Sequence, residues 1–313
     1  MKKYLLIFVL LLLAGCQQNP VEADNKLNEK INNLPSALKE SIADFLSVSE
    51  EELTEEDLVK VTSLWIESDD IDVIHAMNVL ENVEDFSVSL KRIERLEYWD
   101  SLANVKSISL HEIGLKTLEG AEALQTTESL HLSRNEISEI TPILEVNSLK
   151  WLELYNNQIS SLEGIESLTN LQSLELSNNE ISSIEPIQQL SNLRTLSLSG
   201  NPITDFRPIE KLTNLEYLAL SETQLSNLEF LKSLKSLQRL FINNTKVVDL
   251  TPVQHMSELF YLDIRDTEIT SIEPLLGLEN LELLLLNKDK VKDWQLLENK
   301  EGLTISEVPL AAL

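Results

Sequence analysis

A 22-residue repeat runs through most of this 313-residue chain without an insertion. Counted from Val61, eleven units of equal length fill residues 61–302. The fourth, sixth, eleventh and fourteenth positions are apolar in every unit, beginning with Leu64 and Ile66 at the fourth and sixth. A fixed period of this length is typical of a solenoid, in which each unit packs only against its neighbours.

Within each unit, the pattern predicts a short strand followed by a tight helical turn. Positions 4 and 6 alternate with mainly polar residues at positions 3, 5 and 7, as in a strand with one buried face. Positions 11, 14 and 17 recur with the spacing of a 3₁₀-helix, and proline stands at position 16 in five units. Because no unit can bury its own apolar edge, the units must stack. We therefore expect an α/β solenoid, an arc with a parallel sheet on its concave face and 3₁₀ turns on its convex face.

Position 9 predicts a ladder of buried side chains. Four successive units carry asparagine there, at Asn135, Asn157, Asn179 and Asn201. Asparagine both donates and accepts hydrogen bonds, so stacked copies can satisfy the backbone where the chain leaves each strand. The next three units carry threonine, at Thr223, Thr245 and Thr267, and the outer units diverge further. We expect the ladder to weaken toward both ends.

The consensus Leu-x-x-Leu-x-Leu-x-x-Asn-x-Ile-x-x-Ile over residues 61–302 resembles the leucine-rich repeat. Its 22-residue form is similar to that of the bacterial internalins, and also to the phosphatase-regulator type of the nucleus. Residues 38–43 and 54–58 resemble the internalin N-terminal cap. The resemblance implies a horseshoe that binds proteins, in adhesion or host contact. Residues 303–313 are too few for the immunoglobulin-like domain usual in that family.

The N-terminus carries an export pattern. Two lysines precede an apolar run that is too short to span a bilayer and is typical of a signal peptide over residues 1–15. The run ends in Leu-Ala-Gly-Cys, which resembles the lipobox of bacterial lipoproteins, whose cysteine is lipidated. We predict that Cys16, the only cysteine, carries the lipid and that residues 16–27 form a flexible tether. The alternative is an ordinary signal peptide with a chance cysteine.

The two ends of the stack are expected to be closed differently. Residues 28–60 are predicted to form a small helical cap, with capping boxes at residues 49–52 and 54–57. At the other end, residues 303–313 form a short end segment whose first residues are expected to pair as a last strand. One face of the predicted cap helix carries Leu38, Ile42, Phe45 and Leu46.

The charge of the chain excludes one class of partner. The net charge is −27, and removal of residues 1–15 with their two lysines leaves −29. Nucleic acid is not expected as a partner, because phosphate contacts need clustered lysine and arginine. We expect a monomer that is exported and held at the bacterial cell envelope, on the cell membrane or an outer membrane, by its lipid.

The sequence contains no catalytic constellation, neither a glycine-rich phosphate loop nor a His-Glu-x-x-His motif. We therefore predict a protein that is not an enzyme and needs no cofactor. His131, Glu153 and Glu175 follow one another at position 5 of neighbouring strands, with His111 close by at position 7. Adjacent carboxylates repel, and a cation would relieve this, so the three residues are a candidate cation site. The alternative is a solvated polar row.

The concave slots change in character along the chain. Positions 3, 5 and 7 are mainly serine in the early units, whereas aromatic residues and arginine appear later. Exposed aromatics interleaved with arginine are typical of protein-binding hot spots. We predict that a protein ligand is bound by Trp151, Tyr155, Tyr217, Arg239, Phe241, Tyr261, Asp263 and Arg265. Alternatively, these aromatics only brace the sheet. Leu283 and Leu285 either extend the patch or are covered by residues 303–313.

These patterns together indicate a lipid-anchored envelope protein whose concave face binds another protein. Two alternatives stay open. One is a structural or assembly scaffold with a partner in the same envelope, and the other is a surface module that binds cations or carbohydrate.

Overall fold

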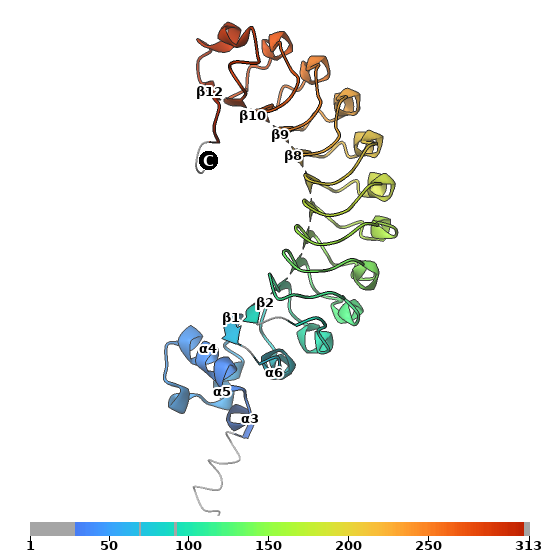
Figure 1. Cartoon of the computed structure of the whole chain (residues 1–313). Coiled ribbons are helices and arrows are strands. Elements are labelled where there is room, and N and C mark those ends of the chain that lie inside the picture. Colours follow the sequence, from blue (N-terminus) through green and yellow to red (C-terminus); the bar gives the residue numbers. More distant parts are fainter. Residues whose placement is uncertain (1–28, 69, 91–92, 310–313) are drawn as a thin grey trace, which may run out of the picture.

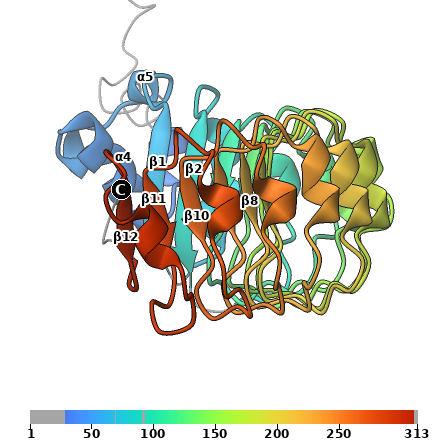
Figure 2. The ribbon, with the colours of Figure 1, turned by 90° about the horizontal axis from the view of Figure 1, so that it is seen from above.

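The chain folds into an open arc of stacked repeats, for which the computed structural model describes residues 29–68, 70–90 and 93–309. The strands line the inner, concave side of the arc, and short helical turns line its outer, convex side (Figure 1). Seen from above, successive turns lie one behind another (Figure 2). The predicted α/β solenoid with a parallel sheet is confirmed.

Twelve parallel strands form one sheet whose spatial order follows the chain. Neighbouring strands pair in the register of the repeat, so that Leu130 lies beside Leu152, and Leu152 beside Leu174. Each repeat position therefore forms a row across the sheet. The strands are β1 (Ser63–Ser68), β2 (Asp85–Leu90), β3 (Ser107–Ser109), β4 (Ser129–His131), β5 (Trp151–Glu153), β6 (Ser173–Glu175), β7 (Thr195–Ser197), β8 (Tyr217–Ala219), β9 (Arg239–Phe241), β10 (Tyr261–Asp263), β11 (Leu283–Leu285) and β12 (Thr304–Ser306).

The convex side consists mainly of 3₁₀ turns, as the three-residue spacing predicts. Proline stands in the first turn of η5, η7, η8, η10 and η11, where its missing N–H has no helical partner to lose. The convex elements are α6 (Asp72–His75), η2 (Ala76–Val79), η3 (Trp99–Leu102), η4 (Ala121–Ala123), η5 (Thr141–Ile143), η6 (Ile165–Ser167), η7 (Glu185–Gln189), η8 (Arg207–Lys211), η9 (Glu229–Ser233), η10 (Thr251–Val253), η11 (Glu273–Leu275) and η12 (Trp294–Leu297).

The apolar positions of all units form one continuous core. In the unit of β5, Leu152, Leu154, Ile159 and Ile165 are completely buried, as are their equivalents in the neighbouring units. Each such side chain contributes about 1.5–3 kcal/mol of transfer free energy, before the entropy of ordering is subtracted. Because the layers are buried against one another, this contribution depends on stacking.

The chain leaves strands β3 to β10 through a left-handed residue at position 8, a feature that the sequence analysis did not find. The φ angles are 54° at Asn156, 55° at Asn178 and 69° at Gly200. Asparagine and glycine adopt this conformation more easily than other residues. A Cβ atom at position 200 would lie 2.1 Å from Oδ1 of Asn178, so a larger residue there would require the Asn178 side chain to move.

The asparagine ladder predicted at position 9 is confirmed, and neighbouring rungs share their acceptors. Asn179 Nδ2 donates to the carbonyl of Leu154 in the preceding unit, at 2.9 Å. Asn157 Nδ2 donates to the same carbonyl at 3.0 Å. In a later unit, Thr267 donates to the Ile264 carbonyl of its own unit, at 2.7 Å. Threonine therefore does not link units as asparagine does, and the ladder weakens toward the C-terminal end as expected.

A small helical cap closes the N-terminal end of the sheet. Two of its helices are α3 (Glu29–Asn32) and α4 (Ser36–Leu46). Leu38 and Ile42 of α4 are completely buried, as predicted. Phe45 was placed on the same buried face, and this is wrong, because it is 43% exposed. The last turn of α4 stands over a surface hollow beside β1, so Phe45 does not reach the core.

Both predicted capping boxes are present, one at η1 (Glu50–Glu52) and one at α5 (Glu55–Leu58). Asp57 accepts hydrogen bonds from Lys60 Nζ at 2.6 Å and from Thr54 Oγ1 at 2.7 Å. These bonds, that of Lys60 first, lower the pKa of Asp57 to about 2. Because the folded-state pKa is lowered, the carboxylate stabilises the cap above its ordinary pKa of 3.8, and this stabilisation is lost as the pH falls toward 2.

The C-terminal end of the sheet is closed by β12, which confirms the expected last strand. Leu284 pairs with Ile305. Leu283 and Leu285 on β11 are 4% and 0% exposed. The alternative that these two leucines extend an exposed patch is therefore wrong.

The predicted signal peptide, Cys16 and the whole of the predicted tether lie at residues 1–27, outside the described residues. Residue 28 and residues 310–313 lie outside them as well. Across the residues that the structure does describe, no helix is both long enough and apolar enough to cross a membrane.

The shared acceptors predict energetic coupling along the ladder. Asn179→Ala should cost about 2 kcal/mol, because the N–H of Ile159 loses its side-chain acceptor while the Leu154 carbonyl keeps Asn157. Replacing Asn157 and Asn179 together leaves that carbonyl without either donor, so the double variant should lose about 1 kcal/mol more than the sum of the single variants. Urea unfolding of the four proteins measures this coupling.

The pair Asn135 and Asn179 is the matched control, because these two side chains share no carbonyl acceptor. Their double variant should be additive to within about 0.5 kcal/mol. Equal coupling in the two pairs would contradict a ladder built on shared acceptors.

Candidate functional site

The concave face of the C-terminal half carries a row of three aromatic rings, called here the aromatic row. It consists of Tyr217 on β8, Phe241 on β9 and Tyr261 on β10. Ring centroids lie 5.1 Å apart between Tyr217 and Phe241, and 4.6 Å apart between Phe241 and Tyr261. Each strand supplies one ring, so the rings follow the spacing of the strands. All three side chains are half-buried, and the row is therefore both braced and accessible.

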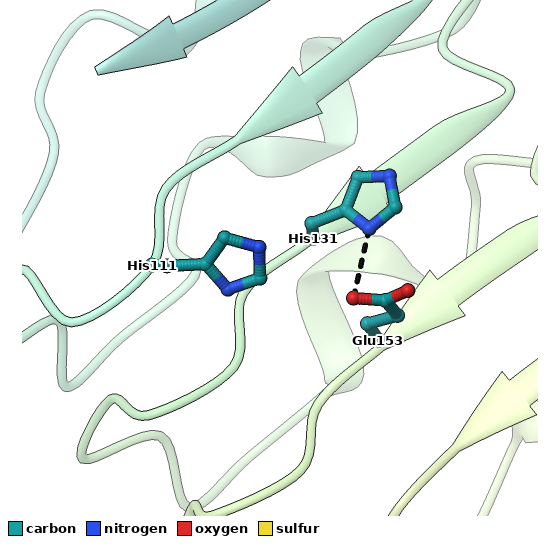
Figure 3. A group of neighbouring side chains, drawn as sticks. All are labelled: His111, His131 and Glu153. Atoms are coloured by element: carbon teal, nitrogen blue, oxygen red, sulfur yellow. Dashed lines mark ion pairs between the residues drawn. The ribbon is translucent and has the colours of Figure 1, made fainter. Parts of the chain in front are cut away.

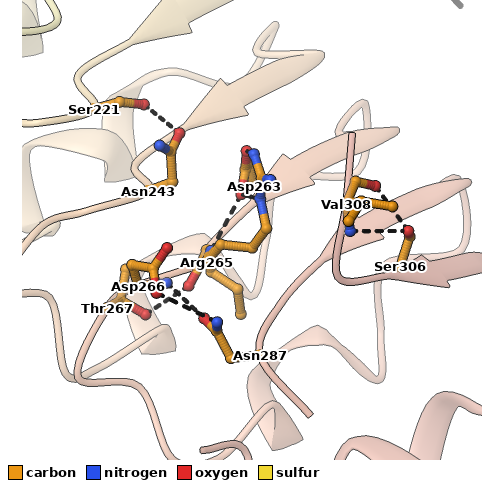
Figure 4. Close-up of polar contacts among 10 residues, drawn as sticks. Ser221, Asn243, Asp263, Arg265, Asp266, Thr267, Asn287, Ser306 and Val308 are labelled. Atoms are coloured by element: carbon orange, nitrogen blue, oxygen red, sulfur yellow. Dashed lines mark hydrogen bonds and ion pairs between the residues drawn. The ribbon is translucent and has the colours of Figure 1, made fainter. Parts of the chain in front are cut away.

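Two arginines flank the aromatic row and are held in different ways. Arg239 is exposed on β9, with Cζ 5.0 Å from the ring centroid of Phe260. Arg265 forms a two-point pair with Asp263, Nε to Oδ1 at 2.9 Å and Nη2 to Oδ2 at 2.6 Å (Figure 4). Asp263 is only 2% exposed, so it fixes the guanidinium of Arg265 and does not itself present a carboxylate to solvent.

Polar contacts also fix the loops beside the aromatic row (Figure 4). Ser221 Oγ donates to Asn243 Oδ1 at 2.5 Å, across two neighbouring units. The backbone N–H of Asp266 donates to Asn287 Oδ1 at 2.6 Å, again between units. The aromatic row therefore lies on a surface whose turns are tied to one another as well as to the sheet.

Trp151 and Tyr155 lie together in the unit of β5, apart from the aromatic row. Strands β6 and β7 separate β5 from β8. Trp151 is 42% exposed, and Lys150 Nζ lies 5.9 Å from its ring centroid. Arg134 Cζ lies 5.8 Å from the ring centroid of Tyr155. The eight residues predicted as one binding set thus fall into two groups on the same face.

A cluster of two imidazoles and a carboxylate lies earlier on the concave face (Figure 3). His111 follows β3, His131 ends β4 and Glu153 ends β5, and potential metal-ligand atoms of all three lie within 4.8 Å of one another. His131 Nδ1 is 2.9 Å from Glu153 Oε2. Glu175, predicted as a member, is not in this group, and its Oε1 accepts from the N–H of Ser177 at 3.0 Å. The third member of the group is His111, which the sequence analysis placed close by at position 7.

The electrostatics of this cluster favour a neutral His111 beside an ionised Glu153. Burial lowers the pKa of His111, which favours its neutral form. The hydrogen bond from His131 lowers the pKa of Glu153, so this carboxyl group is ionised near neutral pH. Among the described residues, Nδ1 of His111 is enclosed without a hydrogen-bond partner.

Sequence reasoning missed a hollow between the cap and the sheet. It has a volume of about 830 Å³ and is lined by α4 and β1. Trp65 on β1, the most exposed aromatic lining it, is 63% exposed, and Phe45 lies on the opposite side. Trp65 occupies position 5 of the first unit, so the repeat register could have identified it as a concave residue.

Comparison with known families agrees with this architecture. A family model described as leucine-rich repeats (2 copies) matches residues 147–189, 169–211, 191–233 and 213–255. The matched residues are therefore leucine-rich repeats. No protein with a curated function matches the sequence significantly.

Solved structures show the same fold. An internalin (inlF) from Listeria monocytogenes has a TM-score of 0.61 at 20% identity, and the match covers 90% of this chain and 98% of that one. Internalin C2 of the same species has a TM-score of 0.55 at 24% identity, covering 82% and 96%. A leucine-rich-repeat protein of Leptospira interrogans has a TM-score of 0.65 at 24% identity, covering 75% and 68%. At these identities, the likeness establishes the leucine-rich-repeat fold alone.

The packing of the aromatic row predicts that two tyrosines ionise at a higher pH than exposed tyrosines do. Burial raises the pKa of both Tyr217 and Tyr261 above the ordinary value of 10.0. We predict that the Tyr217→Phe/Tyr261→Phe variant loses a component of tyrosinate absorbance that the unmodified protein shows above pH 10. Because the folded-state pKa values are raised, these tyrosines stabilise the fold below pH 10, and that stabilisation is lost as the pH rises through the folded values.

The same titration in concentrated urea is the control, since unfolding removes the burial and hence the late component. An unchanged late component in the double variant would show that it arises from other tyrosines and would contradict the burial of these two hydroxyls.

Proposed function

We propose that this leucine-rich-repeat protein binds another protein through the concave face of its C-terminal half. The observation that supports this is the aromatic row, three rings from three successive strands with Arg239 and Arg265 beside them. Aromatic and arginine side chains supply most of the energy at protein interfaces. The proposed role of this face is to bind a partner, and no catalysis is proposed for it.

Preorganisation supports this assignment. The rings pack on one another, and Asp263 fixes Arg265 through two hydrogen bonds. A partner would meet side chains that have already lost much of their rotamer freedom, so the entropy lost on binding is smaller than for a loose surface. The open arc offers this face to a convex partner.

The place of action in this proposal is the bacterial cell envelope. Cys16 would carry the lipid after removal of residues 1–15, and the tether would hold the cap about 15–20 Å from the membrane. The internalin-like fold favours a partner on another cell, so adhesion is the preferred role. A scaffold with a partner in the same envelope uses the same face, and the source of the captured partner separates the two.

A cross-linking capture experiment tests the binding face. The bait is the lipid-free chain, presented to host-cell extract and to extract of the producing cell's own envelope. We predict that a captured partner is lost, by at least about tenfold, when Tyr217, Phe241 and Tyr261 are changed to aspartate, because the hot-spot contacts vanish. The matched control places three aspartates on the early concave face, at Ser87, Ser89 and Ser107, and should keep the partner.

Urea unfolding of both variants verifies that each bait is folded. Equal capture by both variants would exclude the aromatic row as the binding face. Loss in both variants would indicate that added negative charge, and not the aromatic row, governs binding. A partner found in the host extract favours adhesion, and one found in the envelope extract favours the scaffold.

Lipid anchoring is tested separately. We predict that Cys16→Ser abolishes incorporation of a labelled fatty acid and moves the protein from the membrane fraction to the soluble fraction, since Cys16 is the only cysteine. Gln17→Ser is the neighbouring control and should leave labelling intact. An unlabelled natural chain would identify residues 1–15 as an ordinary signal peptide.

A further inference from the structure

We infer that His111, His131 and Glu153 form a binding site for a divalent transition-metal ion, with Zn²⁺ as the best fit. The site lies on the concave face at β3–β5 (Figure 3). The aromatic row lies on β8–β10. It therefore does not rest on the proposed partner-binding function. Two imidazole nitrogens and one carboxylate oxygen are a donor set that zinc uses in proteins.

The distances allow the three donors to close on one ion. Their potential ligand atoms already lie within 4.8 Å of one another. In a tetrahedral zinc site with bonds of about 2.0–2.1 Å, ligand atoms lie about 3.3 Å apart. Partly exposed side chains on three neighbouring strands can close the remaining gap by small rotations, without a shift of the sheet.

His111 faces the other two donors across the strands. Its ring centroid lies 5.9 Å from that of His131, and its Nε2 side is turned toward His131 (Figure 3). Nε2 is therefore the nitrogen of His111 that would bind the ion beside Glu153.

A contact with Ser129 would orient the ring of His131 in the metal-bound site. His131 Nε2 lies 2.7 Å from Ser129 Oγ, while Nδ1 faces Glu153. When Nδ1 offers its lone pair to a metal, the ring proton resides on Nε2 and can be donated to the serine hydroxyl, which accepts as well as donates. Such a bond from the distal nitrogen fixes the tautomer of a ligating histidine.

The donor set also decides which cation fits. Calcium prefers six to eight oxygen ligands, whereas imidazole suits zinc, copper, nickel and iron. Three protein ligands leave one tetrahedral position open toward the concave face, for water or a partner's side chain.

Metal titration of the full-length chain in mild detergent tests the inference. The chain carries Cys16→Ser, to remove a competing thiol, and no histidine tag. In excess Mg²⁺, calorimetry should show one Zn²⁺ per chain, bound at least about a hundredfold more tightly than Ca²⁺. Co²⁺ as a probe should give the intense visible absorption of a four-coordinate site.

Single substitutions assign the ligands. His111→Ala, His131→Ala and Glu153→Gln should each weaken Zn²⁺ binding at least about tenfold, whereas His255→Ala, an exposed histidine on a convex-side loop, should not. Circular dichroism of each metal-free variant verifies the fold, and Glu153→Gln keeps the size of the side chain if an alanine variant fails to fold. Absent Zn²⁺ binding, equal binding in all variants, or equal affinity for Ca²⁺ would each overturn the inference.

Discussion

The structure depends on the burial of one unit's apolar edge by the next. A single 22-residue unit has a strand of three residues and one tight turn, far too little to enclose a core. Stacked, the same leucines and isoleucines form one continuous cluster from Ile31 to Leu297. The end layers have a neighbour on one side only, so α4 covers β1 and β12 covers β11. Without these caps, the outermost leucines would face water.

Hydrophobic stacking gives stability but does not by itself fix how the units are aligned. The position-9 asparagines supply that alignment, because Asn179 joins the backbone of its own unit to that of the preceding one. The left-handed turn at position 8 delivers each asparagine to its place, and Gly200 shows how closely neighbouring turns approach. These polar groups are buried but satisfied, so they specify the alignment without a large desolvation penalty.

Most of the fold could be predicted from the sequence, because the period determines which residues are buried. The site was less predictable. The register placed His111, His131 and Glu153 on one face, but it could not show that Glu175 turns toward Ser177 while His111 joins the cluster. It also could not show that Asp263 is buried against Arg265. Side-chain direction decides these contacts, and repeat spacing does not encode it. The predicted burial of Phe45 was wrong for a related reason. Helical periodicity shows which side chains share a face, but it does not show where the core beneath that face ends.

Both proposed sites on the concave face are built in the same way. The side chains at positions 4 and 6 of each unit form the core. Those at positions 3, 5 and 7 point to the concave face, so they can vary with less effect on the core. Because adjacent strands stand about 4.8 Å apart, one side chain from each of three strands forms a compact group. That spacing suits stacked rings at β8–β10 and a set of metal donors at β3–β5. The core therefore also aligns the proposed sites. Glu153 directly follows the core residue Leu152, so the packing that holds Leu152 beside Leu130 also holds Glu153 beside His131.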